Sequence, residues 1–302
     1  MKKLLILLPA LVVACFAFNR CVKEASTPNP GYNVVESGVN ATQLFEAPMD
    51  VYLQADRAIR FQRDSIIAKN INQSTFTFKI GYISLTVSPA DTTTYPKTVT
   101  VDFGTDTTKT YTGKMIIKVN GNMRNAGSNC AITYNNLITG KSQINGNDSI
   151  ISFGRFVNTD GTISILSHYN THGGHLTGSG NKLMNYDGRL FGKFDISTRT
   201  NHIDSLALVA TDGNGWLYKI NTLGTFYPNL APTCNYFNSG EIKVDILINN
   251  VLTGWFGYDY GYVDTNSGSA QYACDNLGAI YAFSYINKNY QQFYQFYAKN
   301  FN

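Results

Sequence analysis

The sequence contains few charged residues and very few glutamates. Only 15% of its residues are charged, and Glu241 is the only glutamate after Glu46. Aromatic residues are nearly as common, at 13%, with 20 tyrosines among them. Threonine, asparagine and glycine, which are typical of strands and turns, are abundant, while residues that favour helices are scarce. This composition argues against a mainly helical protein and favours β-structure.

Short motifs that mark common catalytic centres are missing as well. The chain has no C-x-x-C pair, no G-x-S-x-G, no P-loop and no H-E-x-x-H. The pattern therefore gives no support for a thioredoxin-like centre, a cysteine zinc site, a serine-hydrolase elbow or a nucleotide-binding loop. Whether the protein is an enzyme stays open, and a non-catalytic role is favoured.

A short apolar run follows a cationic start at the N-terminus. Residues 4–14 are apolar and come directly after Lys2 and Lys3. A transmembrane helix needs about 20 apolar residues, so this run is better suited to the core of a signal peptide covering residues 1–14. It ends in Val-Val-Ala before Cys15, which resembles a lipobox, so we expect Cys15 to carry the lipid. An ordinary cleaved signal peptide is the alternative, and Cys21 is disfavoured because Arg20 precedes it.

The charge of the mature chain would be close to neutral. Removal of Lys2 and Lys3 with the signal peptide takes the formal net charge from +4 to +2. So small a charge gives no electrostatic basis for binding nucleic acid. The lipid on Cys15 would attach the protein to the membrane, and no other cofactor is expected. The sequence predicts an outer-membrane lipoprotein, periplasmic or surface-exposed, whose further partner is a glycan or an envelope protein.

The remaining chain divides into a tether and a body. Residues 15–39 include Pro28, Pro30 and Gly31 among many Ser, Thr and Asn residues, so a flexible tether is expected there. The body covers residues 40–302. Its one expected helix spans about residues 48–62, because Pro48 suits a first helical turn and apolar residues then recur with a period of 3.6.

From residue 75 onward apolar and polar residues alternate, which is the pattern of half-buried strands. Clear examples are Val99, Val101 and Phe103, and then Met115, Ile117 and Val119. The alternation slips by one residue near Gly81, where we expect a bulge or bend. Asn-Gly or Asp-Gly pairs beginning at residues 120, 145, 160, 187 and 212 predict tight hairpin turns. The predicted fold is all-β: an antiparallel sandwich, or a strongly curved sheet with one N-terminal helix packed on it.

Cysteines beyond the anchor are few and widely spaced. Disulfides persist in exported proteins. Cys234 and Cys274 each stand just before a strand-like run and are the preferred pair. Two buried free thiols are an equally consistent interpretation, because connectivity cannot be read from sequence alone.

Two stretches of the chain repeat loosely. Residues 98–117 (TVTVDFG … GKMII) and residues 255–280 (WFGYDYG … CDNLGAI) both read as strand, Asp-aromatic-Gly, polar loop, Gly and apolar strand. With residues 132–140 (ITYNNLITG) and 234–244 (CNYFNSGEIKV), they resemble a group of Bacteroidota lipoproteins that share D-[FY]-G … G-x-[IM] and C-D-N-x-A landmarks. The resemblance covers about residues 75–286 and implies the fold class and an envelope location. It does not indicate any particular activity. In the first repeat, residues 105–111 replace the family's cysteine-containing loop, which removes the basis for a disulfide there.

Three of the four histidines fall within eight residues, at His168, His172 and His175. Neutral imidazoles are good ligands for Zn²⁺ or Cu²⁺, so these residues are a candidate metal site. Gly173 and Gly174 are expected to turn the chain and to bring His172 and His175 face to face. The spacing matches no strong zinc signature, so a solvated polar loop is the alternative.

Four aromatic residues are candidates for a surface that binds a glycan or a partner: Trp216, Trp255, Tyr258 and Tyr260. Aromatic rings supply a large contact area at low entropic cost. The alternative is that these rings fill the core, because only a contiguous exposed patch would indicate recognition.

Asp102 and Asp259 occupy equivalent positions in the two repeats. Such a pair invites comparison with the two carboxylates of glycosidases. A structural role is favoured, because an Asp before an aromatic residue and Gly can accept hydrogen bonds from its own turn. No catalytic residue is therefore assigned. The sequence favours a lipid-anchored binding or structural module, and the alternative is a hydrolase acting on an envelope polymer or glycan.

Overall fold

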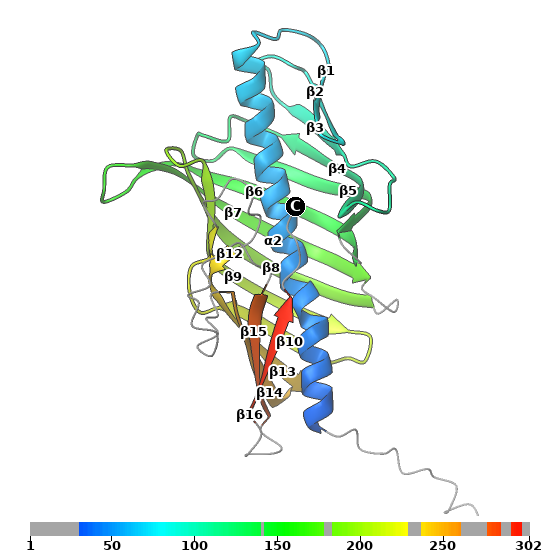
Figure 1. Ribbon diagram of the computed structural model, residues 1–302. Helices are drawn as coiled ribbons and strands as arrows, with labels where there is room; N and C mark the ends of the chain where they lie inside the picture. Colours follow the sequence, from blue (N-terminus) through cyan, green and yellow to red (C-terminus); the bar gives the residue numbers. More distant parts are fainter. Residues whose placement is uncertain are drawn as a thin grey trace, which may run out of the picture.

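The computed structural model shows one long helix packed along a large, curved antiparallel sheet (Figure 1). It describes residues 30–139, 142–177, 183–228, 237–260, 277–284 and 291–297. The predicted signal peptide, Cys15, Cys21, Cys234 and Cys274 lie outside the described residues. In chain order the elements are α2 (Pro30–Ala68), β1 (Phe76–Ile80), β2 (Ile83–Ser88), β3 (Lys97–Asp102), β4 (Tyr111–Val119), β5 (Asn129–Thr139), β6 (Ser142–Val157), β7 (Ile163–Thr177), β8 (Leu183–Asp195), β9 (Thr200–Asp212), β10 (Leu217–Thr222), β11 (Tyr227–Pro228), β12 (Phe237–Ser239), β13 (Glu241–Ile248), β14 (Val251–Asp259), β15 (Leu277–Ser284) and β16 (Gln291–Tyr297).

Fourteen strands form one sheet in the order β1 to β10 and then β13 to β16. Neighbours in this sheet are antiparallel, while β11 and β12 form a separate two-stranded sheet. The all-β prediction is therefore confirmed in its second form, a strongly curved sheet with one N-terminal helix. Both segments of the loose repeat are antiparallel strand pairs, β3 with β4 and β14 with β15.

The helix α2 runs along the strand order of the sheet. Its 39 residues span about 58 Å, and 14 strands spaced about 4.8 Å apart span a similar distance, about 62 Å. One helix can therefore contact β2, β3 and β4 near one edge and β13, β14 and β15 near the other. Figure 1 shows most strands crossing behind the helix, while β15, which contacts the helix, lies beside its lower part.

The middle of α2 is enclosed by the sheet. Every side chain from residue 44 to residue 53 is buried, including the polar Glu46 and Asp50. A helix that is buried on all sides loses the simple apolar stripe of a surface helix. The predicted limits, residues 48–62, were therefore too narrow: α2 begins at Pro30 and ends at Ala68, and Pro48 lies in its interior. Residues 30–39 of the predicted flexible tether belong to this helix. No helix within the described residues has the apolar length needed to cross a lipid bilayer.

The turn predictions were partly wrong. The slip near Gly81 marks a tight turn between β1 and β2, in which Ile80 pairs with Ile83. The Asn-Gly pair that begins at residue 145 lies inside strand β6, and the Asp-Gly pair that begins at residue 187 lies inside strand β8. At Gly188, a Cβ would lie 2.1 Å from Leu208 Cδ2, so the glycine allows a neighbouring strand side chain to approach. Glycine thus marks close packing here as well as turns.

Candidate anion-binding site

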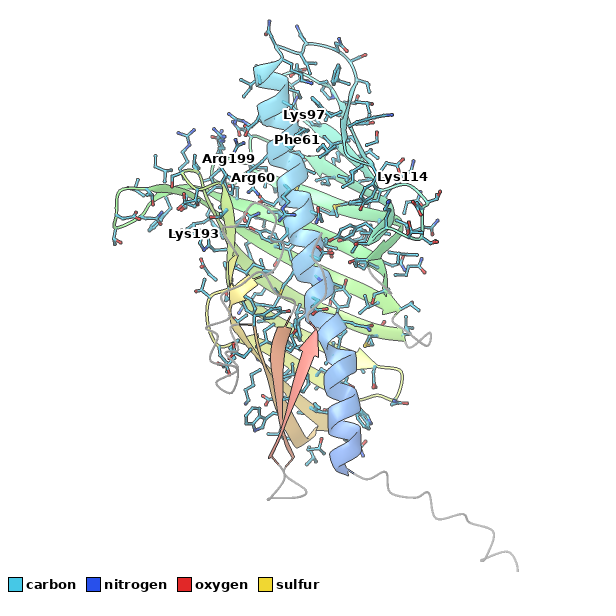
Figure 2. The ribbon with its side chains drawn as sticks, in the orientation of Figure 1. Arg60, Phe61, Lys97, Lys114, Lys193 and Arg199 are labelled. Carbon is cyan, nitrogen blue, oxygen red and sulfur yellow. The ribbon has the colours of Figure 1, made fainter. Side chains whose placement is uncertain are left out.

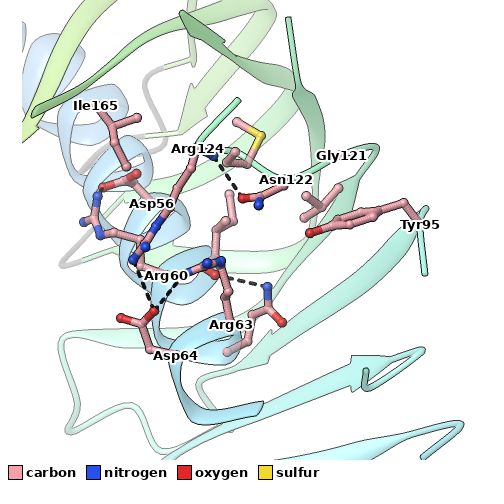
Figure 3. Close-up of a pocket in the computed structure, with 13 residues that line it drawn as sticks. Asp56, Arg60, Arg63, Asp64, Tyr95, Gly121, Asn122, Arg124 and Ile165 are labelled. Carbon is pink, nitrogen blue, oxygen red and sulfur yellow. Dashed lines mark hydrogen bonds and ion pairs between the residues drawn. The ribbon is translucent and has the colours of Figure 1, made fainter. Parts of the chain in front are cut away.

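A groove runs beside the C-terminal part of α2. One hollow of this groove, about 440 Å³ including space open to solvent, lies between the helix and the loop that joins β4 to β5 (Figure 3). A second hollow of about 390 Å³ shares four of its lining residues, so the two are continuous. Those shared residues are Gln62, Arg63, Tyr95 and Asn122.

Three arginines surround one carboxylate at the groove. Asp64 Oδ1 lies 3.2 Å from Arg63 Nη1 and 3.5 Å from Arg124 Nη2, while its Oδ2 lies 3.4 Å from Arg199 Nη2. Arg199, labelled in Figure 2, lies in the turn between β8 and β9, and its ion pair with Asp64 joins this turn to the helix. Each guanidinium group has five N–H donors. The two oxygens of one carboxylate therefore cannot accept hydrogen bonds from all the donors of three guanidinium groups. Donors therefore remain available to a ligand at this end of the groove.

Arg60 lies one helical turn before Asp64 and has its own partners. It forms an ion pair with Asp56, and its guanidinium carbon lies 3.6 Å from the ring centroid of Phe194 on β8. The aromatic face and the carboxylate hold the guanidinium in place. Burial raises the pKa of Asp56, and the positive charge of Arg60 opposes that shift. Figure 3 shows Arg60, Arg63 and Arg124 directed toward the same region.

The groove carries more positive than negative charge. Burial lowers the pKa of Arg124, and the nearby charges of Arg63, Arg155 and Arg60 lower it further, while Asp64 acts in the opposite direction. Four arginines, Arg60, Arg63, Arg124 and Arg199, form ion pairs with the two carboxylates of Asp56 and Asp64, which leaves an excess of two positive charges. Neighbouring like charges repel one another, and the two carboxylates offset only part of this positive charge. The electrostatics therefore favour an anionic ligand.

The far end of the groove is closed by a structural cation. Lys97 is only 2% exposed, and its ammonium donates to the carbonyl oxygens of Pro89 at 3.1 Å and Asp91 at 2.7 Å. It also lies 3.3 Å from Asp91 Oδ1. Asp91 accepts hydrogen bonds from the amides of residues 93 and 94, mainly the latter, which hold its pKa well below the usual range. Since an ammonium has three donors, Lys97 serves this loop and is not available to a ligand.

The predicted histidine site is dispersed along one strand. His168 is stacked on Phe191, with ring centroids 4.3 Å apart, and Phe153 lies on its other side at 6.4 Å. Partial burial is the main cause that lowers the pKa of His168, and the charge of Arg189 adds to it. This imidazole is a member of an aromatic row across β6, β7 and β8.

His172 and His175 are directed to separate partners on β8. His172 Nδ1 lies 3.0 Å from Asp187 Oδ1, and His175 contacts Asn185. The expected hairpin at residues 173–174 is wrong, because β7 continues through them with a shift in register. Within the described ranges no group of three or more His, Cys, Asp or Glu side chains is placed to hold a metal ion. The metal site at His168, His172 and His175 stays a prediction that this geometry does not support.

The predicted aromatic surface is wrong for two of its four residues. Tyr258 is buried on the face of β14 that packs on α2, with its ring centroid 5.7 Å from that of Phe45, and Tyr260, which directly follows β14, is buried as well. Trp255 is half-buried on the opposite face of β14, with Lys243 Nζ 5.7 Å from its ring centroid. Trp216 is half-buried and packs against the core. Adjacent aromatics on a strand alternate in direction, so they cannot all belong to one surface.

Asp102 has the turn-forming role that was predicted for it. Its Oδ1 accepts a hydrogen bond from the amide of Gly104 at 2.9 Å, and its Oδ2 lies 2.8 Å from Lys114 Nζ. The bond from Lys114 is the main cause that lowers its pKa, followed by the bond from Gly104. Asp259 ends β14, nine positions from β3 in the sheet order. The two carboxylates thus belong to distant strands, and the comparison with a glycosidase pair has no support in the sheet order.

Sequence reasoning missed two kinds of residue that the fold brings together. Asp148 is buried, accepts hydrogen bonds from the hydroxyls of Tyr134 and Tyr169, and has a pKa raised by its burial. The arginine groove was missed as well. Only the spacing of Arg60 and Arg63, which places both on one side of a helix, gave a local signal for it. Among the described residues, Cys130 is a buried free thiol.

Comparisons of the chain with protein-family models, with curated proteins and with solved structures each gave no match. The resemblance to Bacteroidota lipoproteins therefore stays a prediction that rests on the quoted motifs. What the chain binds has to be argued from its own geometry.

Proposed function

We propose that the protein is a non-catalytic binding module of the bacterial envelope that holds an anionic group in the arginine groove beside α2. The observation that carries this proposal is the excess of guanidinium groups around Asp56 and Asp64. Arginine is well suited to this task, because its planar fork donates two parallel hydrogen bonds to a carboxylate, phosphate or sulfate.

Binding is favoured over catalysis by the residues that line the groove. None of the lining residues is a histidine, serine or cysteine, the side chains most often used as nucleophile or base, and the ammonium of Lys97 is held by the loop carbonyls. The two carboxylates of the hollow beside the β4–β5 loop, Asp56 and Asp64, both form ion pairs with arginines. The envelope location and the lipid on Cys15 are part of the same proposal and rest on the sequence.

Isothermal titration with inorganic phosphate, at constant ionic strength held with chloride, tests the proposal. We expect saturable binding to the purified protein, and at least tenfold weaker binding to Arg124→Gln, because a hydrogen bond to a charged group contributes about 1.5–3 kcal/mol. The matched control is Arg189→Gln, which removes the same charge from an exposed position on β8. Thermal unfolding of both variants without phosphate checks that they fold.

Two results contradict the proposal. One is the absence of saturable phosphate binding to the wild-type protein. The other is equal weakening by Arg124→Gln and Arg189→Gln, which would mean that phosphate responds only to the overall charge.

A further inference from the structure

The groove is lined by apolar as well as charged side chains. Ile59, Val119, Met123 and Ile165 line the same hollow as Arg60, Arg63 and Arg124. A site for an inorganic anion would need only the polar groups. The combination of a cationic cluster with an adjoining apolar wall suits a ligand that has both characters.

An exposed apolar ledge continues from this wall. It is formed by Val157 on β6 and Ile163 on β7, which are opposite each other in the sheet. Ile163 and Ile165 are two residues apart on β7, and side chains at that spacing share a face. Ile165 lines the groove, so the ledge extends the groove wall outward along the β6–β7 hairpin, which projects to one side in Figure 1.

The exposure of the ledge differs sharply from that of the wall beside it. Ile165 and its neighbour Phe194 on β8 are 9% and 8% exposed, whereas Ile163 is 39% and Val157 is 65% exposed. Arg155 lies opposite Ile165 in the β6–β7 pair, so a cation stands between the ledge and the groove. Large exposed aliphatic side chains next to a charged pocket are what a ligand with an apolar tail would cover.

From this juxtaposition we infer that the ligand is an anionic amphiphile, a single-chain lipid with a phosphate monoester head group. Its head binds among Arg60, Arg63 and Arg124, and its chain passes Ile165 and lies on Val157 and Ile163. The inference rests on the proposed anion site and names its ligand class. A phosphate monoester is favoured over a carboxylate because it carries up to two negative charges, which match the excess of two positive charges, and has three acceptor oxygens for the guanidinium groups.

Alkyl phosphates of different chain length test the inference. Monobutyl phosphate and monooctyl phosphate share a head group, and each methylene that leaves water should tighten binding by about fourfold. We expect octyl phosphate to bind the wild-type protein at least tenfold more tightly than butyl phosphate in isothermal titrations below the micellar concentration. Octanoate should bind more weakly than octyl phosphate.

The ledge is tested by the double substitution Val157→Ser with Ile163→Ser. It should remove most of the chain-length effect and leave the affinity for inorganic phosphate unchanged. Val251→Ser with Leu252→Ser is the matched control, because these residues of β14 are 64% and 39% exposed and lie on a strand that does not line the groove. The control should keep the wild-type preference for the longer chain.

The outcomes separate this inference from the proposed function. If inorganic phosphate and both alkyl phosphates fail to bind, the anion site itself is wrong. If phosphate binds but octyl and butyl phosphate bind equally, only the amphiphile is wrong. A chain-length effect that survives the ledge substitutions would place the chain elsewhere and overturn the inference, as would octanoate binding more tightly than octyl phosphate.

Discussion

The buried carboxylate of Asp50 offers a sharp test of the enclosed helix. Asp50 Oδ1 accepts a hydrogen bond from the Tyr111 hydroxyl at 2.7 Å, and its Oδ2 accepts one from the Thr139 hydroxyl at 2.8 Å. Burial is the largest influence and raises the pKa of Asp50 from 3.8 to about 6, although these hydrogen bonds and the charge of Arg57 oppose the shift. The substitution Asp50→Asn removes the titrating group and keeps a similar shape.

The sign of the effect follows from which state holds the proton. Between about pH 4 and pH 6 the folded protein keeps a proton on Asp50 that the unfolded chain has released, so stability falls as the pH rises. A shift of about two units corresponds to roughly 3 kcal/mol in the free energy of unfolding. The contribution of Asp50 to the free energy of unfolding is thus fully present below pH 4 and is lost above pH 6. The Asn variant has no such loss.

Urea denaturation at pH 3.5, 5 and 7, followed by tryptophan fluorescence, measures this difference. The free energy of unfolding of Asp50→Asn minus that of the wild type should rise by about 3 kcal/mol from pH 3.5 to pH 7. Asp106→Asn is the control: this exposed carboxyl has its pKa lowered by hydrogen bonds from Thr108, so its difference should not rise. A constant difference for Asp50→Asn across the pH range would refute the burial of this carboxylate by the sheet.

Three further predictions address packing, the first turn and the anchor. Gly192→Ala should destabilise the fold by about 1–3 kcal/mol in denaturation experiments, because its Cβ would lie 1.9 Å from Tyr52 Oη; Gly224→Ala, whose Cβ meets nothing within 4 Å, should be nearly neutral, and equal effects would argue against this contact. Asp102→Ala should cost about 1 kcal/mol, whereas Asn should keep most of the stability through the Gly104 amide; an Asn variant as unstable as Ala would contradict the turn role. Cys15→Ala should release the protein from membrane fractions, and release by Cys21→Ala instead would show that the lipid is on Cys21.

Local patterns predicted the strands well, because a strand that is buried on one face must alternate. Val99 and Val101 of β3 point into the hydrophobic core, and so do Met115 and Ile117 of β4. The register of these two strands pairs Val99 with Ile117. The limits of α2 were harder to predict. A helix enclosed by a sheet has no polar face to define its phase, and its ends depend on contacts with strands far along the chain.

The sequence by itself determined that the chain forms antiparallel strands, since period-two alternation and turn residues are local properties. It also marked Asp102 as a turn former, because the partner amide is two residues away. Only the tertiary structure decided that Tyr258 and Tyr260 are core residues, because composition does not say which face of β14 meets the helix. The arginine groove depends on the same curvature. Its cations come from α2, from the β4–β5 loop, from β6 and from the β8–β9 turn, and these are brought together only where the sheet bends around the helix.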